Sequence, residues 1–126
     1  MENNSVITLK ARIKLAKARA GEITLPVISG IAIGDGAEKG GAIRTPSETD
    51  VRLNNELIRK ESSTITKISD AAYRYRIDLE TDELSGKIIN EAALYDADGD
   101  LLAIKTFKGK PKDGDIEMAF EFDDIF

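Results

Sequence analysis

The sequence contains no cysteine, no histidine and no tryptophan. Without cysteine there is no disulfide framework, no thiol nucleophile and no thiolate metal ligand. Without histidine, the commonest general base and the commonest zinc ligand are missing. A catalytic site would have to use carboxylates, lysine, tyrosine or hydroxyl groups, and no motif arranges these groups for catalysis. We therefore expect no enzyme activity and no cofactor.

Long hydrophobic runs are also missing. No apolar stretch approaches the roughly 18 residues that a membrane-spanning helix needs, and the N-terminus has no uncharged apolar segment behind it. We expect a soluble protein without a secretion signal. The 126 residues, 41% of them hydrophobic, suffice for a single domain over residues 1–126 around one core.

Charge is unevenly distributed along the chain, which has 18 basic and 23 acidic residues and a formal net charge of −5. Five basic residues and no acidic one lie between Ser5 and Ala20, so the rest of the chain holds 13 basic and 23 acidic residues. An acidic surface repels the phosphates that dominate duplex affinity. The basic segment has no aromatic residue to stack on bases or to anchor at a membrane. We therefore expect neither nucleic acid nor a membrane as a partner.

The basic segment is predicted to be a helix over residues 5–20. Apolar residues recur there at spacings of three and four, the pattern of a stripe that faces the core: Val6, Leu9, Ile13, Ala16 and Ala20. Lys10, Lys14 and Lys17 fall on the other side of the helix. These lysines either only solubilise the helix or dock it onto an acidic partner. We favour docking and take all three as candidates for a protein interface.

The rest of the chain is predicted to be mostly β-structure. Residues 27–33 form a β-branched apolar run that ends in a glycine turn, and residues 37–47, with adjacent glycines and a proline, predict a flexible loop. A capping pattern favours a short helix from Thr45 to about Leu53. Residues 57–122 predict mainly antiparallel strands with alternating polarity. The expected fold class is α+β, with the N-terminal helix packed on a mostly antiparallel β-sheet or a small β-sandwich.

A group of aspartates, Asp96, Asp98 and Asp100, surrounds Gly99 and offers the clustered carboxylate oxygens that calcium prefers. A calcium loop of the EF-hand type has its glycine at position six and a glutamate at position twelve. Here Gly99 is at position four and Phe107 at position twelve. The Asp-Gly pair is instead a strong signal for a hairpin turn. The turn is therefore the favoured interpretation, with the three aspartates as a weaker candidate metal site.

Three segments carry a resemblance to a known family: Ile31–Gly36 (IAIGDG), Leu53–Arg59 (LNNELIR) and Ile88–Ala103 (IINEAALYDADGDLLA). Their order and content resemble the N-terminal domain of phage tail-collar fibre proteins. That domain shows an hIAVGDG strand and turn, an L-x-NE-x-x-R segment and an I-x-E-hGLFDADGxLIAV hairpin, where h is apolar. The resemblance covers about residues 5–108. Ala93 stands where the family usually has glycine, and the sequence ends at Phe126 with no fibre shaft or receptor-binding tip.

The resemblance implies a structural component of a phage or phage-like tail. Such a protein attaches a tail fibre, or forms its base, at the baseplate or collar. Its partners are other tail or baseplate proteins and further copies of itself, often as a trimer. It would be made in the bacterial cytoplasm and end in the virion tail.

Two alternatives come from other classes of protein. A small non-catalytic carbohydrate-binding module would also be β-rich, but sugar-binding surfaces usually present aromatic rings. The sequence has three tyrosines and no tryptophan, so it offers few rings for stacking on a sugar. A carboxylate-based hydrolase would need two acids about 5 to 9.5 Å apart in a cleft. Four acids lie close enough along the chain to supply such a pair: Asp78, Glu80, Asp82 and Glu83. They lie at the end of a predicted strand, however, where acids commonly mark a solvated turn.

Overall fold

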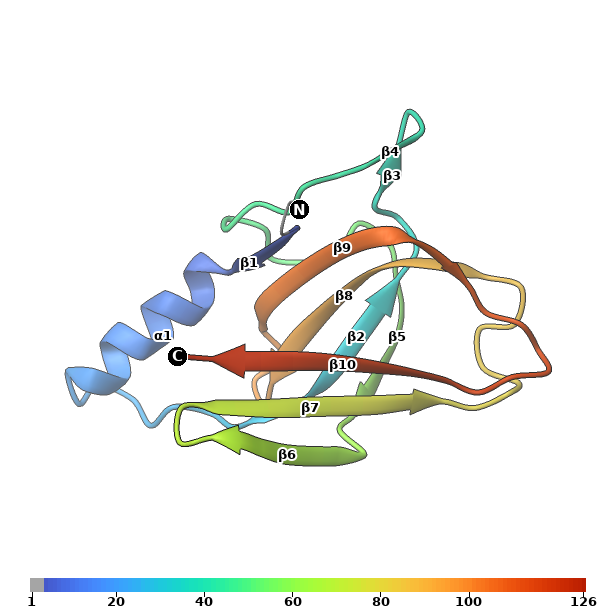
Figure 1. Cartoon of the computed structure of the whole chain (residues 1–126). Helices are drawn as coiled ribbons and strands as arrows, with labels where there is room; N and C mark the ends of the chain where they lie inside the picture. The colour runs from blue at the N-terminus through green and yellow to red at the C-terminus, as the bar shows by residue number, and fades with distance from the viewer. Residues whose placement is uncertain (1–3) are drawn as a thin grey trace.

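The structure is a computed structural model that describes residues 4–126 as two antiparallel β-sheets and one short helix (Figure 1). A five-stranded sheet has the order β1-β9-β8-β2-β5, a three-stranded sheet has the order β10-β7-β6, and β3 and β4 form a small ribbon. The elements are β1 (Ser5–Ile7), α1 (Leu9–Arg19), β2 (Ile28–Gly34), β3 (Glu38–Lys39), β4 (Ala42–Ile43), β5 (Glu56–Glu61), β6 (Thr64–Ser69), β7 (Ala72–Leu79), β8 (Ile88–Asp96), β9 (Leu101–Pro111) and β10 (Met118–Ile125).

The main core lies between the two sheets, as in a small β-sandwich. Strands alternate their side chains between two faces, so every second residue of each strand points inward. Both sheets contribute to one buried cluster, which contains Ile31, Ile33, Ile77, Leu79, Ile89, Ala92, Leu94, Ala103, Phe120 and Phe122. Strands make up 50% of the chain and the helix 9%, so the fold is predominantly β, and the expected α+β class is loosely consistent with it.

A second buried cluster lies on the other face of the five-stranded sheet. It contains Ala32, Leu53, Ala93, Tyr95, Leu101 and Ile104, with Val6 packed against it. Leu53 belongs to the irregular segment before β5, which therefore covers this face of the sheet. The capping pattern at Thr45 does not start a helix. The segment is held instead by Arg44, whose guanidinium lies 2.6 Å from the Asp50 carboxylate, while that carboxylate accepts the Ser47 amide at 2.9 Å.

The ends of two predicted elements differ from the expectation. Residues 5–7 form strand β1 on the edge of β9 rather than the first turn of the helix. The helix begins after Thr8, whose hydroxyl accepts the amide of Ala11 and donates to the carbonyl of Leu101 at 2.8 Å. Within the predicted loop 37–47, β3 and β4 form a short hairpin around two glycines with positive φ.

The apolar stripe of α1 faces away from the sheets, which corrects the predicted orientation of the helix. Leu9 and Ile13 are 40% and 41% exposed, whereas Ala11 and Lys14 are buried. Periodicity shows which residues share a face of a helix but not which way that face points. The rotation of α1 is fixed by the polar contacts of Thr8 and Lys14 with the β8–β9 hairpin.

Candidate functional site

The β8–β9 hairpin ends in an acidic turn, Asp96–Asp100, as the Asp-Gly pair predicted. One carboxylate oxygen of Asp96 accepts the amides of Asp98 and Asp100, each at 3.0 Å. Gly99 has φ +86°, a conformation that favours glycine, and its amide bonds the Asp96 carbonyl at 2.8 Å. Asp96 therefore closes the turn through its own side chain.

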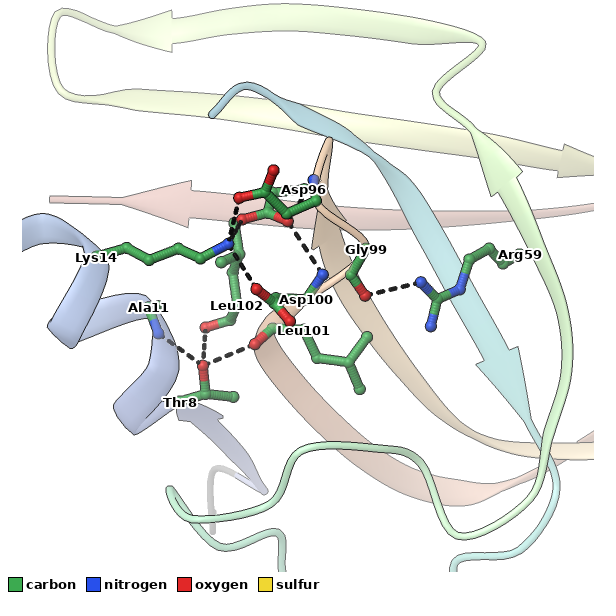
Figure 2. Close-up of polar contacts among 10 residues, drawn as sticks. Thr8, Ala11, Lys14, Arg59, Asp96, Gly99, Asp100, Leu101 and Leu102 are labelled. Carbon is green, nitrogen blue, oxygen red and sulfur yellow. Dashed lines mark hydrogen bonds and ion pairs between the residues drawn. The ribbon is translucent and has the colours of Figure 1, made fainter. Parts of the chain in front are cut away.

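Lys14 reaches from α1 into the centre of this turn (Figure 2). Its ammonium nitrogen lies 2.6 Å from Asp96, 3.0 Å from Asp98 and 2.7 Å from Asp100. Burial by itself would lower the pKa of Lys14, but the hydrogen bonds to the three carboxylates outweigh this effect and raise it. The hydrogen bond from Lys14 in turn lowers the pKa of Asp100. One buried cation thus holds three carboxylates together and docks the helix on the hairpin.

The contacts of Lys14 bear on two predictions, the candidate metal site at the three aspartates and the candidate protein interface at Lys14 itself. The carboxylate oxygens of Asp96, Asp98 and Asp100 lie within 4.8 Å of one another, close enough to hold a cation, and the ammonium of Lys14 lies among them. A metal ion would have to displace that ammonium. Lys14 is only 7% exposed, so its side chain is not on the solvent side of the helix as expected. Lys10 and Lys17 are exposed and remain candidates for an interface.

The three segments that carried the family resemblance meet at the carboxylate of Glu91. This buried group accepts backbone amides from Gly36 at 2.8 Å and from Asn54 and Asn55 at 2.9 Å each. Charge-assisted bonds to amides compensate for the burial of a carboxylate. In the sequence, Glu91 stands out only as part of the third family motif and as a further acid near the three aspartates. Its role depends on three segments that are separated along the chain, and the occurrence of all three motifs together is the only signal that points to it.

Neighbouring side chains complete this Glu91 cluster. The side-chain oxygen of Asn90 accepts the amide of Ala37 at 2.9 Å, and Asn55 donates to the Asp35 carboxylate at 2.7 Å. A β-bulge between Ile89 and Glu91 interrupts the β8–β9 register at this point. A bulge re-aims side chains, and here Asn90 and Glu91 both bond the turn after β2. The cluster therefore fastens the central strand β8 to the turn after β2 and to the segment before β5.

Glycine is required where that turn passes the cluster. A Cβ on Gly34 would lie 2.6 Å from a carboxylate oxygen of Glu91, and one on Gly36 would lie 2.7 Å from the amide nitrogen of Asn55. Both distances are shorter than real Cβ contacts allow. The Gly-Asp-Gly motif thus provides close backbone approach, and the amide of Gly36 binds the carboxylate of Glu91.

Arg59 connects the second motif to the acidic turn. Its guanidinium donates to the Gly99 carbonyl at 2.9 Å (Figure 2) and forms two hydrogen bonds with Glu56. The hydrogen bonds to Glu56 raise the pKa of Arg59. The same group stacks over the ring of Tyr95 at 4.7 Å, a cation–π contact. The arginine of the L-x-NE-x-x-R pattern is therefore a brace for the hairpin.

Two of the four acids considered for hydrolysis, Asp78 and Glu83, have separate structural partners. Asp78 accepts hydrogen bonds from Ser63 and Arg76, which lower its pKa. The pKa of Glu83 is lowered by the backbone amide of Glu80 and by Lys60. A general acid of a glycosidase needs a raised pKa, so neither group has the character of that acid.

The aromatic residues also differ from those of a sugar-binding platform. Tyr95 is buried beneath Arg59, and Tyr75 packs against the main core. Tyr73, on the same face of β7, is exposed. Among the three tyrosines, one exposed ring therefore remains for stacking on a sugar.

Among the grooves on the described part of the molecule, two are prominent. The larger, of about 600 Å³, opens between β9 and β10. There the ammonium of Lys105 lies 4.5 Å from the centre of the Phe122 ring and 2.6 Å from the Glu121 carbonyl, and burial lowers its pKa. The smaller groove, of about 280 Å³, is largely apolar and lies between α1 and the end of β10.

The outward face of α1 is the other prominent surface. Its exposed apolar ridge consists of Leu9, Ile13, Ala16 and Ala20. Basic residues seven positions apart lie two turns apart on the same side of a helix, so two basic rows flank the ridge. One row is Lys10 with Lys17, and the other is Arg12 with Arg19. Arg12 pairs with Glu48 at 2.7 Å; no ion pair involves the other three within residues 4–126. The face is therefore both apolar and positively charged.

The acidic turn with Lys14, the Glu91 cluster and Arg59 thus hold turns in place and dock the helix. Such contacts are typical of a structural β-sandwich module. Comparison with protein-family models gives a match to the phage tail-collar fibre protein, N-terminal family over residues 1–119. The chain belongs to this family. Comparison with curated proteins and with solved structures gives no match. Family membership indicates a structural role in a phage tail fibre, in the virion tail and in association with other tail proteins. Within residues 4–126, no helix is long and apolar enough to cross a membrane.

Proposed function

We propose that the chain forms the base of a tail fibre and attaches it at the baseplate or collar as a non-enzymatic homo-oligomer. The family resemblance favours a trimer. The observation that carries this proposal is the outward face of α1 in a protein of the tail-collar fibre family. Monomeric proteins rarely expose a large contiguous apolar patch without a partner. An apolar ridge between basic rows is suited to holding another protein.

The remaining structure supports an attachment role because it is rigidly tied. The Glu91 cluster connects two loops to strand β8, while Arg59 of β5 and Lys14 of α1 contact the turn of the β8–β9 hairpin. Each contact fixes an element that lies far away in the sequence, so a force applied to α1 passes directly into the five-stranded sheet. A module that joins a fibre to a tail needs this stiffness more than it needs a cleft.

The experiment is genetic complementation in the phage or prophage that carries the gene. Particles produced without this chain should have complete tails and no fibres at the baseplate or collar when viewed by negative-stain electron microscopy. Restoring the gene with an epitope tag should restore the fibres and place the antibody label where they attach. Fibres present without the chain, or label absent from purified particles, would overturn the proposal.

The same purified protein tests the carbohydrate-binding alternative. A glycan array that covers bacterial surface sugars should give no signal above that of a variant with Tyr73→Ala, because one exposed ring provides little stacking surface. A saccharide that binds the native protein but not the variant would favour the sugar-binding module.

A further inference from the structure

The second charged surface of the molecule is a pair of neighbouring loops, residues 80–87 and 112–117. Lys112 holds them together: its buried ammonium donates to the carbonyls of Thr81 and Asp113 at 3.0 Å each. Its backbone bonds Gly86 and Lys87 at 2.8 Å each. The two loops therefore form one continuous surface, which we term the acidic loop pair.

Five acidic residues lie exposed on the acidic loop pair: Glu80, Asp82, Asp113, Asp115 and Glu117. Within residues 4–126, no ion pair involves any of the five, and Lys87 is the exposed cation of the same loops. Ile116, between two of these acids, is 46% exposed. This surface therefore has an apolar centre with acidic flanks, which is the complement of the apolar ridge and basic rows of α1.

The two surfaces lie at opposite ends of the molecule. In Figure 1, α1 projects at one end of the sandwich, while the connections β7–β8 and β9–β10 lie at the far end of the long strands. The outward face of α1 cannot pack well against the same face of another copy, because each basic row would meet a basic row and like charges repel. A contact between unlike ends brings opposite charges together.

We propose that copies of this chain associate head to tail, with the outward face of α1 on one copy bound to the acidic loop pair of the next. This inference deepens the proposed homo-oligomeric fibre base, on which it rests, by naming the surfaces that join its copies. Ile116 packs against the ridge of Leu9 and Ile13, and the acids around it meet the two basic rows. Because the two surfaces differ, the contact is heterologous: it forms a ring where the rotation between copies closes and an open row where it does not.

Charge reversal provides the test. The variant Lys10→Glu/Lys17→Glu reverses one basic row, and Asp115→Lys/Glu117→Lys reverses the opposing acids. All four residues are exposed and none forms an ion pair within residues 4–126, so each variant should fold with a native circular dichroism spectrum. The matched control, Lys39→Glu/Lys108→Glu, reverses two exposed lysines that belong to neither surface and form no ion pair within residues 4–126.

Light scattering over a range of protein concentrations reads the association. We expect the native chain and the control to gain mass with concentration, less so at high salt. Each reversed pair should weaken association by about tenfold or more, since complementary charges both steer and hold the contact. The variant with all four changes has an acidic helix and basic loops, and it should recover the mass of the native chain.

Three outcomes would overturn the proposal. The first is that the reversed pairs associate like the native chain. The second is that the fourfold variant fails to recover while its folded spectrum is intact. The third is that reversal at α1 removes the chain from purified tails but leaves its mass in solution unchanged, which would assign α1 to a different tail protein. That last result would leave the proposed fibre-base function standing, so the two proposals fail separately.

Discussion

Replacing Lys14 by Met removes the ammonium from the acidic turn and keeps an unbranched side chain in its place. Three carboxylates with oxygens within 4.8 Å of one another then lack their shared cation, and Asp96 among them is fully buried. Removing one partner of a buried ion pair costs about 3 to 5 kcal/mol. The side chains of Asp98 and Asp100 are 61% and 37% exposed, so water relieves part of the repulsion. We therefore expect the free energy of unfolding to fall by about 3 kcal/mol.

Urea unfolding followed by circular dichroism at pH 7 measures this loss. The matched control is Lys17→Met, a substitution of the same kind at an exposed position of the same helix, which should change the free energy of unfolding by less than about 0.5 kcal/mol. For a domain of this size, a loss of about 3 kcal/mol corresponds to a fall in Tm of roughly 10 °C. A loss equal to that of the control would refute the reasoning.

The pH dependence separates charge from packing at Lys14. The raised pKa of Lys14 adds stability that is fully present below the ordinary lysine pKa and is lost only as the pH rises through the folded-state pKa. The lowered pKa of Asp100 adds stability that is present above the ordinary aspartate pKa and is lost as the pH falls through the folded-state pKa. The native chain and Lys14→Met should therefore differ most near neutral pH and converge below about pH 4. An equal difference at pH 7 and pH 3 would show that lost packing causes the effect.

Three further predictions concern the turns. Millimolar calcium should leave the Tm of the native chain within about 1 °C, because the Lys14 ammonium must leave first and weak ligands stabilise little; a rise of several degrees contradicts this. Glu91→Gln keeps one side-chain acceptor for three amides and should lower the free energy of unfolding in urea by about 2 kcal/mol, whereas a neutral result would mean that the Glu91 cluster adds nothing to stability. Gly99→Val places a β-branched residue at φ +86° and should cost about 1 to 3 kcal/mol in the same assay; an unchanged midpoint would show that the turn relaxes.

The strands could be predicted from sequence because their signal is local. In β7 and β10, apolar and charged residues alternate, and the inward-facing members Ile77, Leu79, Phe120 and Phe122 are all buried. A period of two residues identifies both the strand and its buried face, since a sheet offers only two faces. The Asp-Gly turn likewise specifies its hairpin within a few residues.

The helix and the Glu91 cluster depend on distant residues, and here the sequence was less informative. Thr8 and Lys14 bond groups 93 and 82 positions away, and these contacts decide which way α1 faces. An exposed ridge of Leu9 and Ile13 cannot be distinguished by periodicity from a buried one. Glu91 has no local pattern that separates it from a surface acid. Lys14, which fixes the rotation of α1, is therefore a residue that the sequence analysis placed on the outer side of the helix.

The way in which α1 is held has a consequence for its function. Packing the ridge of Leu9 and Ile13 onto the sandwich would bury more apolar surface, and hydrophobic burial alone would favour that orientation. It would also turn Lys14 outward and leave the buried Asp96 carboxylate without its cation, at a cost of about 3 to 5 kcal/mol. The buried ion pair thus selects one rotation of the helix, in addition to the stability that it adds. The rotation that it selects is the one that keeps the apolar ridge and its basic rows available to a partner.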